Sequence, residues 1–395
     1  MNYDIAIIGG GIIGLSTAWN IQNKFPQKSI TILEKEPQIA QHQTGHNSGV
    51  IHSGIYYKPN SKKAKTCRAG IFLLEKFCKI NEIPFKKCGK VIVATKHEEL
   101  PNLQKLYENG KQNNLQGLEI IQKDQLREIE QNTAGIQALL VPETGVVDYT
   151  KVSQKLAEII EKNGGKIQTG FRVTEIKCEH KRFILRSSNE EITANFLINA
   201  SGLYSDRIAR MASVQTEIQI IPFRGEYFRL NQEGEKLVNT LIYPVPNPSM
   251  PFLGVHFTKN IAGEVSIGPS AVLALAREGY RKMDIQPTDL AEILTTPAFW
   301  KLIKQIGKFA SGEILRSFSK KAFVKAAQKM VPAITTNHIA EFESGVRAQA
   351  ISKDGQLLDD FAIVQVENQI HILNAPSPAA TASLAIGKSI ADLIH

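Results

Sequence analysis

Three glycines, Gly9, Gly11 and Gly14, have the spacing with which proteins cradle the pyrophosphate of a dinucleotide. They follow an apolar run at residues 3–8 and precede apolar residues at helical spacing, which predicts a strand, a tight turn and a helix. Residues 29–33 predict a second strand ending on Glu34, whose carboxylate would accept hydrogen bonds from ribose hydroxyls. Because an acid there disfavours a 2′-phosphate, we predict FAD or NAD rather than NADP. The alternative, a glycine-rich turn in an ordinary βαβ unit, leaves Glu34 unexplained.

Three further stretches have the composition of ligand-binding segments. Residues 41–59 are crowded with histidine, tyrosine, glycine and hydroxyl side chains, and we favour a loop that wraps a polar cofactor over an ordinary surface loop. Residues 196–202 form an apolar run that stops at small residues. Residues 374–381 are rich in proline and small residues, and we expect them to open a helix that runs to Leu393 with its N-terminus facing an anionic or electron-rich group. The cofactor domain must therefore be discontinuous.

The elements between these stretches are expected to support them. We predict a packing helix at residues 64–79, an amphipathic helix at residues 152–162, and one strand at residues 167–176 with Val173 near its centre. The strand-rich, proline-broken stretch at residues 218–267 predicts the large sheet of a substrate domain.

Composition limits the class of protein. With 395 residues the chain exceeds the ~250–300 at which one core usually stops growing, so we expect two domains. A net charge of +9 fits anionic substrates, an anionic membrane surface or nucleic acid without choosing among them. The four cysteines include no C-x-x-C pair, which argues against zinc, a redox dithiol or a secreted disulfide framework and favours reduced cytosolic thiols. We expect no signal peptide, since the N-terminus lacks a basic region, and no membrane span, since no apolar run reaches ~20 residues.

A basic amphipathic segment at residues 298–330 leaves two interpretations open. It carries eight bases against the single acid Glu313, interleaved with aromatic and aliphatic residues. Such a helix suits an anionic bilayer surface. It equally suits a solvated helical face that packs on the domain core. The eight bases are Lys301, Lys304, Lys308, Arg316, Lys320, Lys321, Lys325 and Lys329.

The chain resembles the L-2-hydroxyglutarate dehydrogenases, also called oxidases, of the FAD-dependent D-amino-acid-oxidase-like superfamily. The glycine fingerprint at residues 9–14 is common to many flavoproteins, whereas the segments at residues 44–59 and 374–381 are more particular. The remaining segments that carry the resemblance are residues 199–206, 222–227, 243–246, 254–258, 277–281 and 345–350, so it spans nearly the whole chain.

The resemblance implies an α/β fold with a discontinuous Rossmann-type FAD-binding domain and an α+β substrate domain built on a large mixed or antiparallel sheet. We assign residues 1–86, 146–217 and 345–395 to the FAD domain, and residues 87–145 and 218–344 to the substrate domain. The implied activity is oxidation of L-2-hydroxyglutarate to 2-oxoglutarate, with electrons passed to a membrane quinone or to O2. The expected protein is cytoplasmic and peripheral on the inner membrane, without a nucleic-acid partner or a metal.

The expected FAD contacts come from all three parts of the FAD domain. No cysteine is placed by a motif for a covalent flavin bond, so we expect dissociable FAD. The predicted contacts are Gly9, Gly11, Ile12, Ile13, Gly14, Glu34, Lys35, Thr44, Gly45, His46, Asn47, Ser48, Gly49, Val50, His52, Val173, Ala200, Ser201, Gly202, Arg347, Pro376, Ser377, Pro378, Ala379, Ala380 and Thr381.

The implied reaction needs a base for the hydroxyl proton, and histidine fits because its ordinary pKa of ~6.5 leaves it largely neutral. His256 is the preferred base, with His52 or His46 near the flavin ring. A dicarboxylate also needs cationic anchors. Arg347 is our choice for the C1 carboxylate. The alternative for Arg347 and for the basic residues named next is that they form surface ion pairs. The distal carboxylate is assigned to Arg277, Arg281 or Lys58, with Arg224 also in the substrate set, and Tyr56, Tyr243 and Tyr280 as further donors.

Two rival interpretations remain. One keeps the flavin and replaces the substrate by an amino acid or glycerol 3-phosphate. The other is not an enzyme: a dinucleotide-loaded protein that binds membranes through residues 298–330. The sequence fixes neither the electron acceptor nor the oligomeric state.

Overall fold

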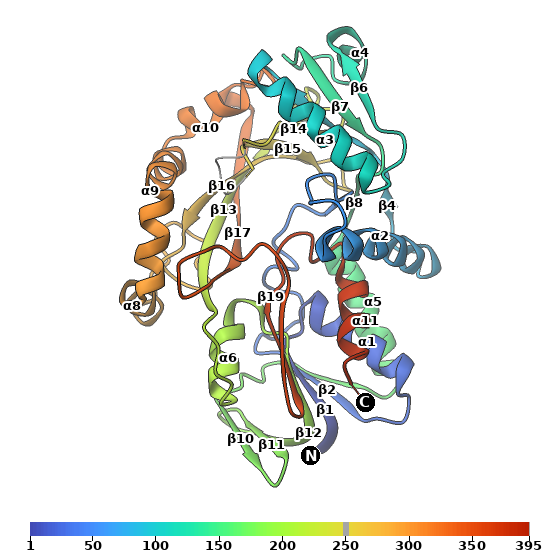
Figure 1. Ribbon diagram of the computed structural model, residues 1–395, viewed down its shortest axis with the longest axis vertical. Coiled ribbons are helices and arrows are strands. Elements are labelled where there is room, and N and C mark those ends of the chain that lie inside the picture. The colour runs from blue at the N-terminus through green and yellow to red at the C-terminus, as the bar shows by residue number, and fades with distance from the viewer. Residues whose placement is uncertain (248–252, 395) are drawn as a thin grey trace.

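The computed structural model describes residues 1–247 and 253–394, without the side chains of residues 308–311, 314 and 315. Two large sheets divide the described chain, one below the other in the view of Figure 1. A small third sheet joins them, made of β3 (Val50–Ile51), β8 (Gly145–Val147) and β4 (Phe85–Lys86).

The first sheet has a parallel centre. Its strands lie in the order β19 (Gln369–Asn374), β12 (Glu191–Asn199), β1 (Asn2–Ile8), β2 (Ile30–Leu33) and β9 (Lys166–Gln168). Antiparallel strands extend it: β10 (Glu175–Glu179) and β11 (Arg182–Arg186) beside the first half of β12, and β18 (Ala362–Val366) beside β19. The predicted strand at residues 167–176 is wrong. Gly170, at φ 72°, turns the chain between β9 and β10, and Val173 lies in that connection.

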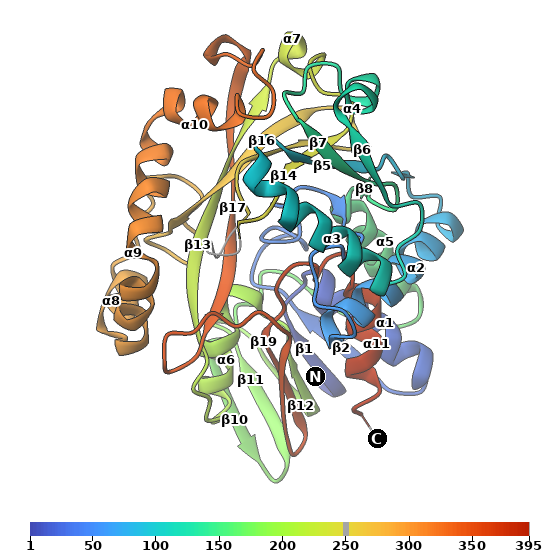
Figure 2. The same ribbon diagram turned by 45° about the horizontal axis from the view of Figure 1, so that its top comes forward.

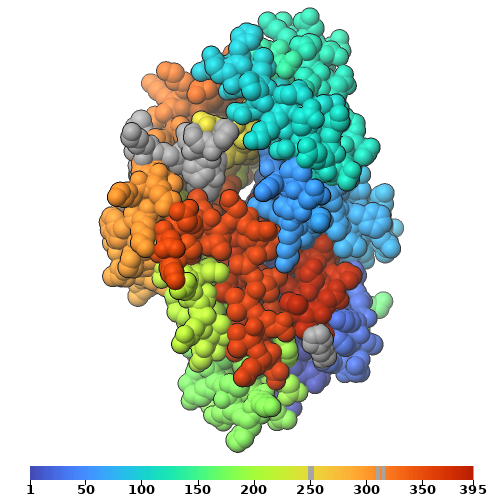
Figure 3. All heavy atoms as spheres, in the orientation of Figure 1, coloured from blue at the N-terminus to red at the C-terminus, as the bar shows by residue number. Residues whose placement is uncertain are grey.

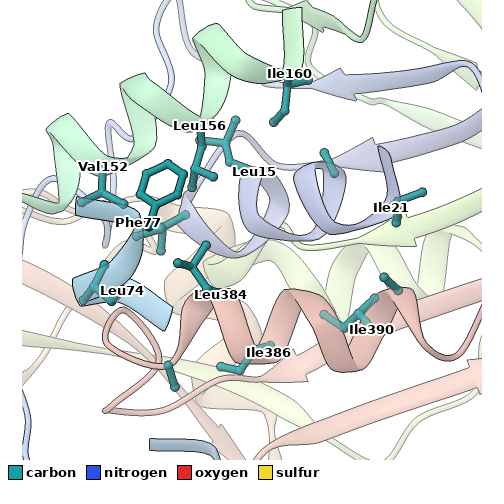
Figure 4. Close-up of a cluster of buried hydrophobic side chains, with 14 of the residues drawn as sticks. Leu15, Ile21, Leu74, Phe77, Val152, Leu156, Ile160, Leu384, Ile386 and Ile390 are labelled. Carbon is teal, nitrogen blue, oxygen red and sulfur yellow. The ribbon is translucent and has the colours of Figure 1, made fainter. Parts of the chain in front are cut away.

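Helices cover both faces of this sheet. Alternation along β1 turns Ile5 and Ile7 to a core shared with α1 (Ile12–Lys24), α2 (Lys62–Ile80), α5 (Tyr149–Lys162) and α11 (Ser383–Ala391), shown in Figure 4. Ala6 and Ile8 face the opposite side, where α6 (Ser205–Met211) packs. The last helix begins at Ser383, later than predicted, because residues 377–382 form turns first.

The second sheet runs in the order β17, β13, β16, β15, β14, β5, β7, β6. The predicted domain boundary at residue 345 falls inside β17, which belongs to this sheet along its whole length. The predicted boundary between residues 145 and 146 likewise falls inside β8, and the division into domains stays a prediction. The strand bounds are β5 (Lys90–Ala94), β6 (Glu119–Gln122), β7 (Gln137–Val141), β13 (Gln219–Leu230), β14 (Leu241–Pro244), β15 (His256–Lys259), β16 (Val265–Leu273) and β17 (Ile339–Ile351).

Helices also flank the second sheet, as Figure 2 shows from a second angle. They are α3 (Leu100–Gln112), α4 (Lys123–Ile129), α7 (Gln232–Glu235), α8 (Pro287–Thr295), α9 (Pro297–Phe318) and α10 (Lys320–Ala327), with 3-10 turns η1 (His97–Glu99), η2 (Gly202–Tyr204) and η3 (Thr336–His338) along the chain. In the part of the chain that the structure describes, no helix combines the length and the apolarity needed to cross a bilayer.

The core that positions the dinucleotide turn is open to a direct test. Leu15 is fully buried on α1, one residue after Gly14, in the core of Figure 4. Leu15→Ala should lower the free energy of unfolding by about 2–5 kcal/mol, since it removes buried methyl groups and leaves a cavity. The measurement is a denaturant titration. The same substitution at the exposed Leu294 should change stability by no more than about 0.5 kcal/mol, and equal effects at both positions would contradict this account.

Candidate active site

Three strand ends meet at one edge of the first sheet. β12 pairs in parallel with β1 on one side and with β19 on the other, and Asn199 stands opposite both Ile8 and His371. Parallel strands bring their carboxyl ends to the same edge, which is where open α/β sheets bind ligands. The segments that follow, at residues 9–14, 200–202 and 375–381, therefore converge although they lie far apart in the sequence.

The glycine turn has the shape that a pyrophosphate requires. Gly9 adopts φ +114°, and a Cβ at Gly14 would lie 2.0 Å from the Gly9 carbonyl oxygen, so the strand and α1 approach too closely for any side chain. The first turn of α1 contains no acidic residue, and the Ile12 N–H donates to Thr44 Oγ1 at 3.1 Å. The N-terminus of α1 thus presents its positive end without an acidic residue in its own first turn.

Glu34 stands where the ribose is expected. Its Oε2 accepts the Gly10 N–H at 2.7 Å and its Oε1 accepts the Glu36 N–H at 2.9 Å, which fixes the carboxylate beside the glycine turn. Each carboxylate oxygen can accept a second hydrogen bond. Together with the glycine turn, this geometry fits the adenosine and pyrophosphate of FAD.

A cavity of about 750 Å³ begins at this cradle and reaches the second sheet. The space-filling view in Figure 3 shows the molecular surface hollowed where N-terminal and C-terminal segments adjoin. All but three of the predicted FAD contacts line it. Gly14 instead packs on Gly9, while Gly45 and Gly49 lie between lining residues of the same loop. Five predicted residues of the catalytic set line it as well: His52, Tyr56, Tyr243, His256 and Arg347.

His256 is held with one ring nitrogen facing the Gly254 carbonyl, at 2.9 Å from Nδ1. Because a carbonyl only accepts, Nδ1 carries the proton and Nε2 keeps a lone pair. The ring packs on Tyr243, with centroids 4.0 Å apart. Burial lowers the pKa of His256 to about 4, with the positive charges of Arg347 and Lys90 acting in the same direction. At neutral pH this imidazole is therefore uncharged, and its Nε2 lone pair is not occupied by a proton.

His52 lines the same cavity and interacts electrostatically with His256. Its backbone N–H donates to Thr381 Oγ1 at 3.1 Å, and its carbonyl accepts from the Cys67 thiol at 3.2 Å. Burial, then the charge of Lys90, lowers its pKa to about 3. His46 also lines the cavity, and its ring packs on Tyr280, with centroids 4.4 Å apart.

The predicted cationic anchors need correction, since only Arg347 lines the cavity. Arg277 is buried and holds Asp206 through both guanidinium nitrogens, at 2.5 and 2.9 Å. Arg224 is buried against Glu226 Oε1 at 2.9 Å. The side chains of Lys58 and Arg281 are exposed outside the cavity. Arg277 and Arg224 therefore stabilise the fold, and the sequence could not reveal partners that only the fold brings to them.

Several residues of the site were missed from the sequence. Lys63 and Tyr57 line the cavity, with Lys63 Nζ 5.0 Å from the Tyr57 ring centroid. Tyr149 donates to the Val50 carbonyl at 3.0 Å and pairs with Thr381 Oγ1 at 2.9 Å, which fixes the C-terminal segment beside His52. Tyr149 precedes the helix predicted at residues 152–162, and the sequence gave no signal of its role in the site. Lys90 lies just behind the wall, under the rings of Tyr56 and Tyr243.

A cluster of Glu36, His42 and Glu278 lies near the adenosine end with metal-ligand spacing. The ammonium group of Lys35 is bonded to both carboxylates and lies 2.8 Å from His42 Nε2. This cation bridges both carboxylates and offsets one of their two negative charges, so the cluster is described as an ion-pair network.

The chain matches the family described as FAD dependent oxidoreductase over residues 4–393. It is 48% identical over 393 residues to the L-2-hydroxyglutarate dehydrogenase of Indibacter alkaliphilus, covering 99% of this chain and 98% of that protein. The mitochondrial L-2-hydroxyglutarate dehydrogenase of Homo sapiens is 43% identical, over 100% of this chain and 89% of that one. A solved structure of L-alpha-glycerophosphate oxidase from Mycoplasma pneumoniae with FAD bound has a TM-score of 0.80 at 23% identity, covering 100% of this chain and 95% of that one. The predicted family and fold are confirmed.

The depressed histidine pKa values predict acid sensitivity. An unfolded chain binds a proton at His256 near pH 6.5, whereas the folded protein does so only near pH 4, so this contribution to stability is present above pH 6.5 and is lost as the pH falls toward 4. His256→Gln should remove about 2–3 kcal/mol of the stability lost between pH 7 and pH 4.5, measured by denaturant titration. His97→Gln, at an exposed position, should leave the loss unchanged. A wild-type pH dependence in the His256 variant would contradict a neutral, buried His256.

Proposed function

The chain belongs to the FAD-dependent oxidoreductases, within the group of the L-2-hydroxyglutarate dehydrogenases, and we propose that it oxidises L-2-hydroxyglutarate to 2-oxoglutarate. The observation that carries the proposal is the cavity itself. It begins at a dinucleotide cradle and ends among two neutral histidines and the cationic side chains of Arg347 and Lys63. An oxidisable alcohol that carries two carboxylates suits such an end.

FAD is assigned to the three converging segments, with adenosine at Glu34, pyrophosphate at the N-terminus of α1, and the flavin ring toward residues 376–381. When bound, it supplies the oxidant, accepting a hydride at its N5 atom. We propose that FAD is bound without a covalent bond to the protein.

His256 is assigned as the base. Its Nε2 lone pair is available because Nδ1–H is held by the Gly254 carbonyl, and this fixed tautomer would receive the hydroxyl proton as C2 is oxidised. His52 is assigned to the wall beside the flavin ring, since its own backbone is tied to Thr381 in the C-terminal segment. Arg347, on β17, is assigned to the C1 carboxylate, for which a guanidinium offers two parallel donors.

The test of the reaction is anaerobic addition of substrate to the purified flavoprotein. L-2-hydroxyglutarate should bleach the flavin absorbance, while D-amino acids and glycerol 3-phosphate should not. Bleaching by either of the others would favour the corresponding rival, and no bleaching by any would favour a binding protein. Re-oxidation with a quinone analogue or with air then identifies the electron acceptor, for which we propose membrane quinone or O2.

Loss of the base should separate turnover from cofactor binding. His256→Ala should reduce the rate of flavin reduction by about 10² to 10⁴ while the bound FAD content stays at the wild-type level. His52→Ala should have the smaller effect on this rate. The measurement is anaerobic stopped-flow spectroscopy with the flavin content determined beforehand. A larger loss of rate in His52→Ala than in His256→Ala would exchange the roles of the two histidines. Wild-type rates of flavin reduction in both variants would exclude both residues as the base.

We also propose that the flank formed by α8, α9 and α10 lies against an anionic bilayer. The apolar residues Phe299 and Leu302 are buried against the second sheet, so the interpretation as a packing face accounts for that side of α9. The opposite side keeps Trp300, 55% exposed, and Phe318, 72% exposed. They are 18 residues apart, five turns of an α-helix, and therefore project from the same side, with Lys304 one turn beyond Trp300.

Vesicle binding tests this flank. Wild-type protein should sediment with phosphatidylglycerol vesicles and less with phosphatidylcholine vesicles, and binding should weaken as salt rises. The double change Trp300→Ser and Phe318→Ser should weaken binding about tenfold or more. Phe72→Ser, at a 68% exposed position on α2, is the matched control and should bind like the wild type. Equal loss in both variants would argue against α9 as the contact.

A further inference from the structure

Lys90 occupies an unusual place for a lysine. It is the first residue of β5, which lies between β14 and β7 in the middle of the second sheet, and it is only 1% exposed. Side chains alternate along a strand, so Lys90 shares a face with Ile92. Ile92 belongs to the buried cluster that includes Tyr243 and has Tyr56 packed against it. The strand thus delivers the Lys90 ammonium group to the inner side of the cavity wall.

Two aromatic rings separate this ammonium group from the cavity. Lys90 Nζ lies 4.3 Å from the centroid of the Tyr56 ring and 4.9 Å from that of Tyr243, and both tyrosines line the cavity. The Tyr243 ring also packs on His256, the assigned base. The Tyr56 hydroxyl is buried without a hydrogen-bond partner among the described residues. A positive charge therefore underlies the part of the wall where the substrate is expected.

Within the described residues, Lys90 has no acidic partner. The only neighbouring ionisable group that favours its charged form is the Cys67 thiol, and burial lowers the pKa of Lys90 to about 7. The other buried cations near this sheet are paired, Arg277 with Asp206 and Arg224 with Glu226. A buried ammonium group without an anion is unfavourable unless a ligand supplies the charge. Its position behind the cavity wall points to an anionic ligand in the cavity.

We propose that Lys90 selects a substrate with a second carboxylate: its ammonium group, held behind the rings of Tyr56 and Tyr243, attracts the distal carboxylate of the bound hydroxy diacid. This inference rests on the proposed function and deepens it. Lys90 acts through the two tyrosines and is a positioning residue. Arg347 then binds the C1 carboxylate, so each carboxylate has its own cation.

The proposal implies a pH dependence of binding. The ionisable groups around Lys90 and its two tyrosines are His52, His256, Cys67, Arg347, Tyr57, Tyr227 and Cys88. Burial raises the pKa values of Tyr57 and Cys88. The histidines gain their protons near pH 3 and 4, and burial raises the pKa values of Tyr56, Tyr243 and Cys67, the last to about 12. Between pH 6 and 8 the charge that changes in this set is that of Lys90. Dicarboxylate affinity should therefore fall as the pH rises through this range.

The experiment compares glutarate with valerate, which lacks the second carboxylate, as ligands of the FAD-loaded enzyme. Dissociation constants come from perturbation of the flavin spectrum at pH 6 and pH 8. Lys90→Met should weaken glutarate binding by about 10- to 100-fold. This is the size expected for a charge roughly 8 Å away at an effective dielectric constant near 20. Lys90→Met should weaken valerate binding by less than about threefold. It should also abolish the pH dependence of glutarate binding. Lys90→Gln should have the same effects on glutarate and valerate binding as Lys90→Met.

Stability provides the readout that separates this role from a structural one. Replacing a lone buried cation by methionine should raise the melting temperature while selectivity is lost. The control is Lys87→Met, three residues earlier, where the side chain is 51% exposed and pairs with Glu75. It should keep wild-type affinities for both ligands.

Two results would overturn the proposal: wild-type discrimination in Lys90→Met and Lys90→Gln, or an equal loss of glutarate and valerate binding in both. Failure of the proposed function is distinguishable, because it would appear in the wild type as flavin that L-2-hydroxyglutarate does not reduce.

Discussion

The parallel pairing of β12 with both β1 and β19 is the constraint on which the site depends. It places the residues after three strands at one sheet edge, although they are separated by up to 366 positions between Gly9 and Ala375. The Asn199 side chain fixes the junction, because its Nδ2 donates to the Ser205 carbonyl at 2.7 Å and its Oδ1 accepts from Ser201 Oγ at 2.6 Å. Its Nδ2 also lies 3.0 Å from Nδ1 of His371 on β19, so one buried amide joins segments from the middle and the end of the chain.

The distribution of buried charge gives the two ends of the cavity different properties. At the adenosine end cations and carboxylates lie side by side, as Lys35 does with Glu36 and Glu278. At the other end the cations Arg347, Lys63 and Lys90 surround histidines that burial keeps neutral. Positive charges at that end favour an anionic substrate. The overall charge of +9 gave no hint of this local arrangement, since most surface bases are far from the cavity.

The sequence predicted the parts of the fold that depend on local pattern. The glycine fingerprint, the strand ending at Glu34 and the small-residue junctions at residues 200–202 and 376–381 all line or shape the cavity, because strand periodicity and glycine geometry are local properties. The roles of the charged residues were harder to predict. Arg277 and Lys90 are both basic residues in ordinary sequence surroundings, yet one is paired with Asp206 and the other has no acid near it in the described chain. Such differences depend on which distant residue the fold brings close. The predicted strand at residues 167–176 failed for a local reason, since Gly170 permits a left-handed turn inside an alternating pattern.

The charges that suit a dicarboxylate also bear on the base. Arg347 and Lys90 help to keep His256 without a proton before the substrate arrives, which leaves Nε2 able to accept one. A bound dianion would offset these charges, so the proton affinity of His256 would rise when the substrate hydroxyl is in place. A base with a pKa of about 4 is a weak acceptor for an alcohol proton, whereas one with a pKa nearer neutrality is effective at the pH of the cell. Substrate charge and base strength are therefore coupled through the same two cations. A neutral alcohol in this cavity would lack that assistance even if its C2 atom occupied the same place.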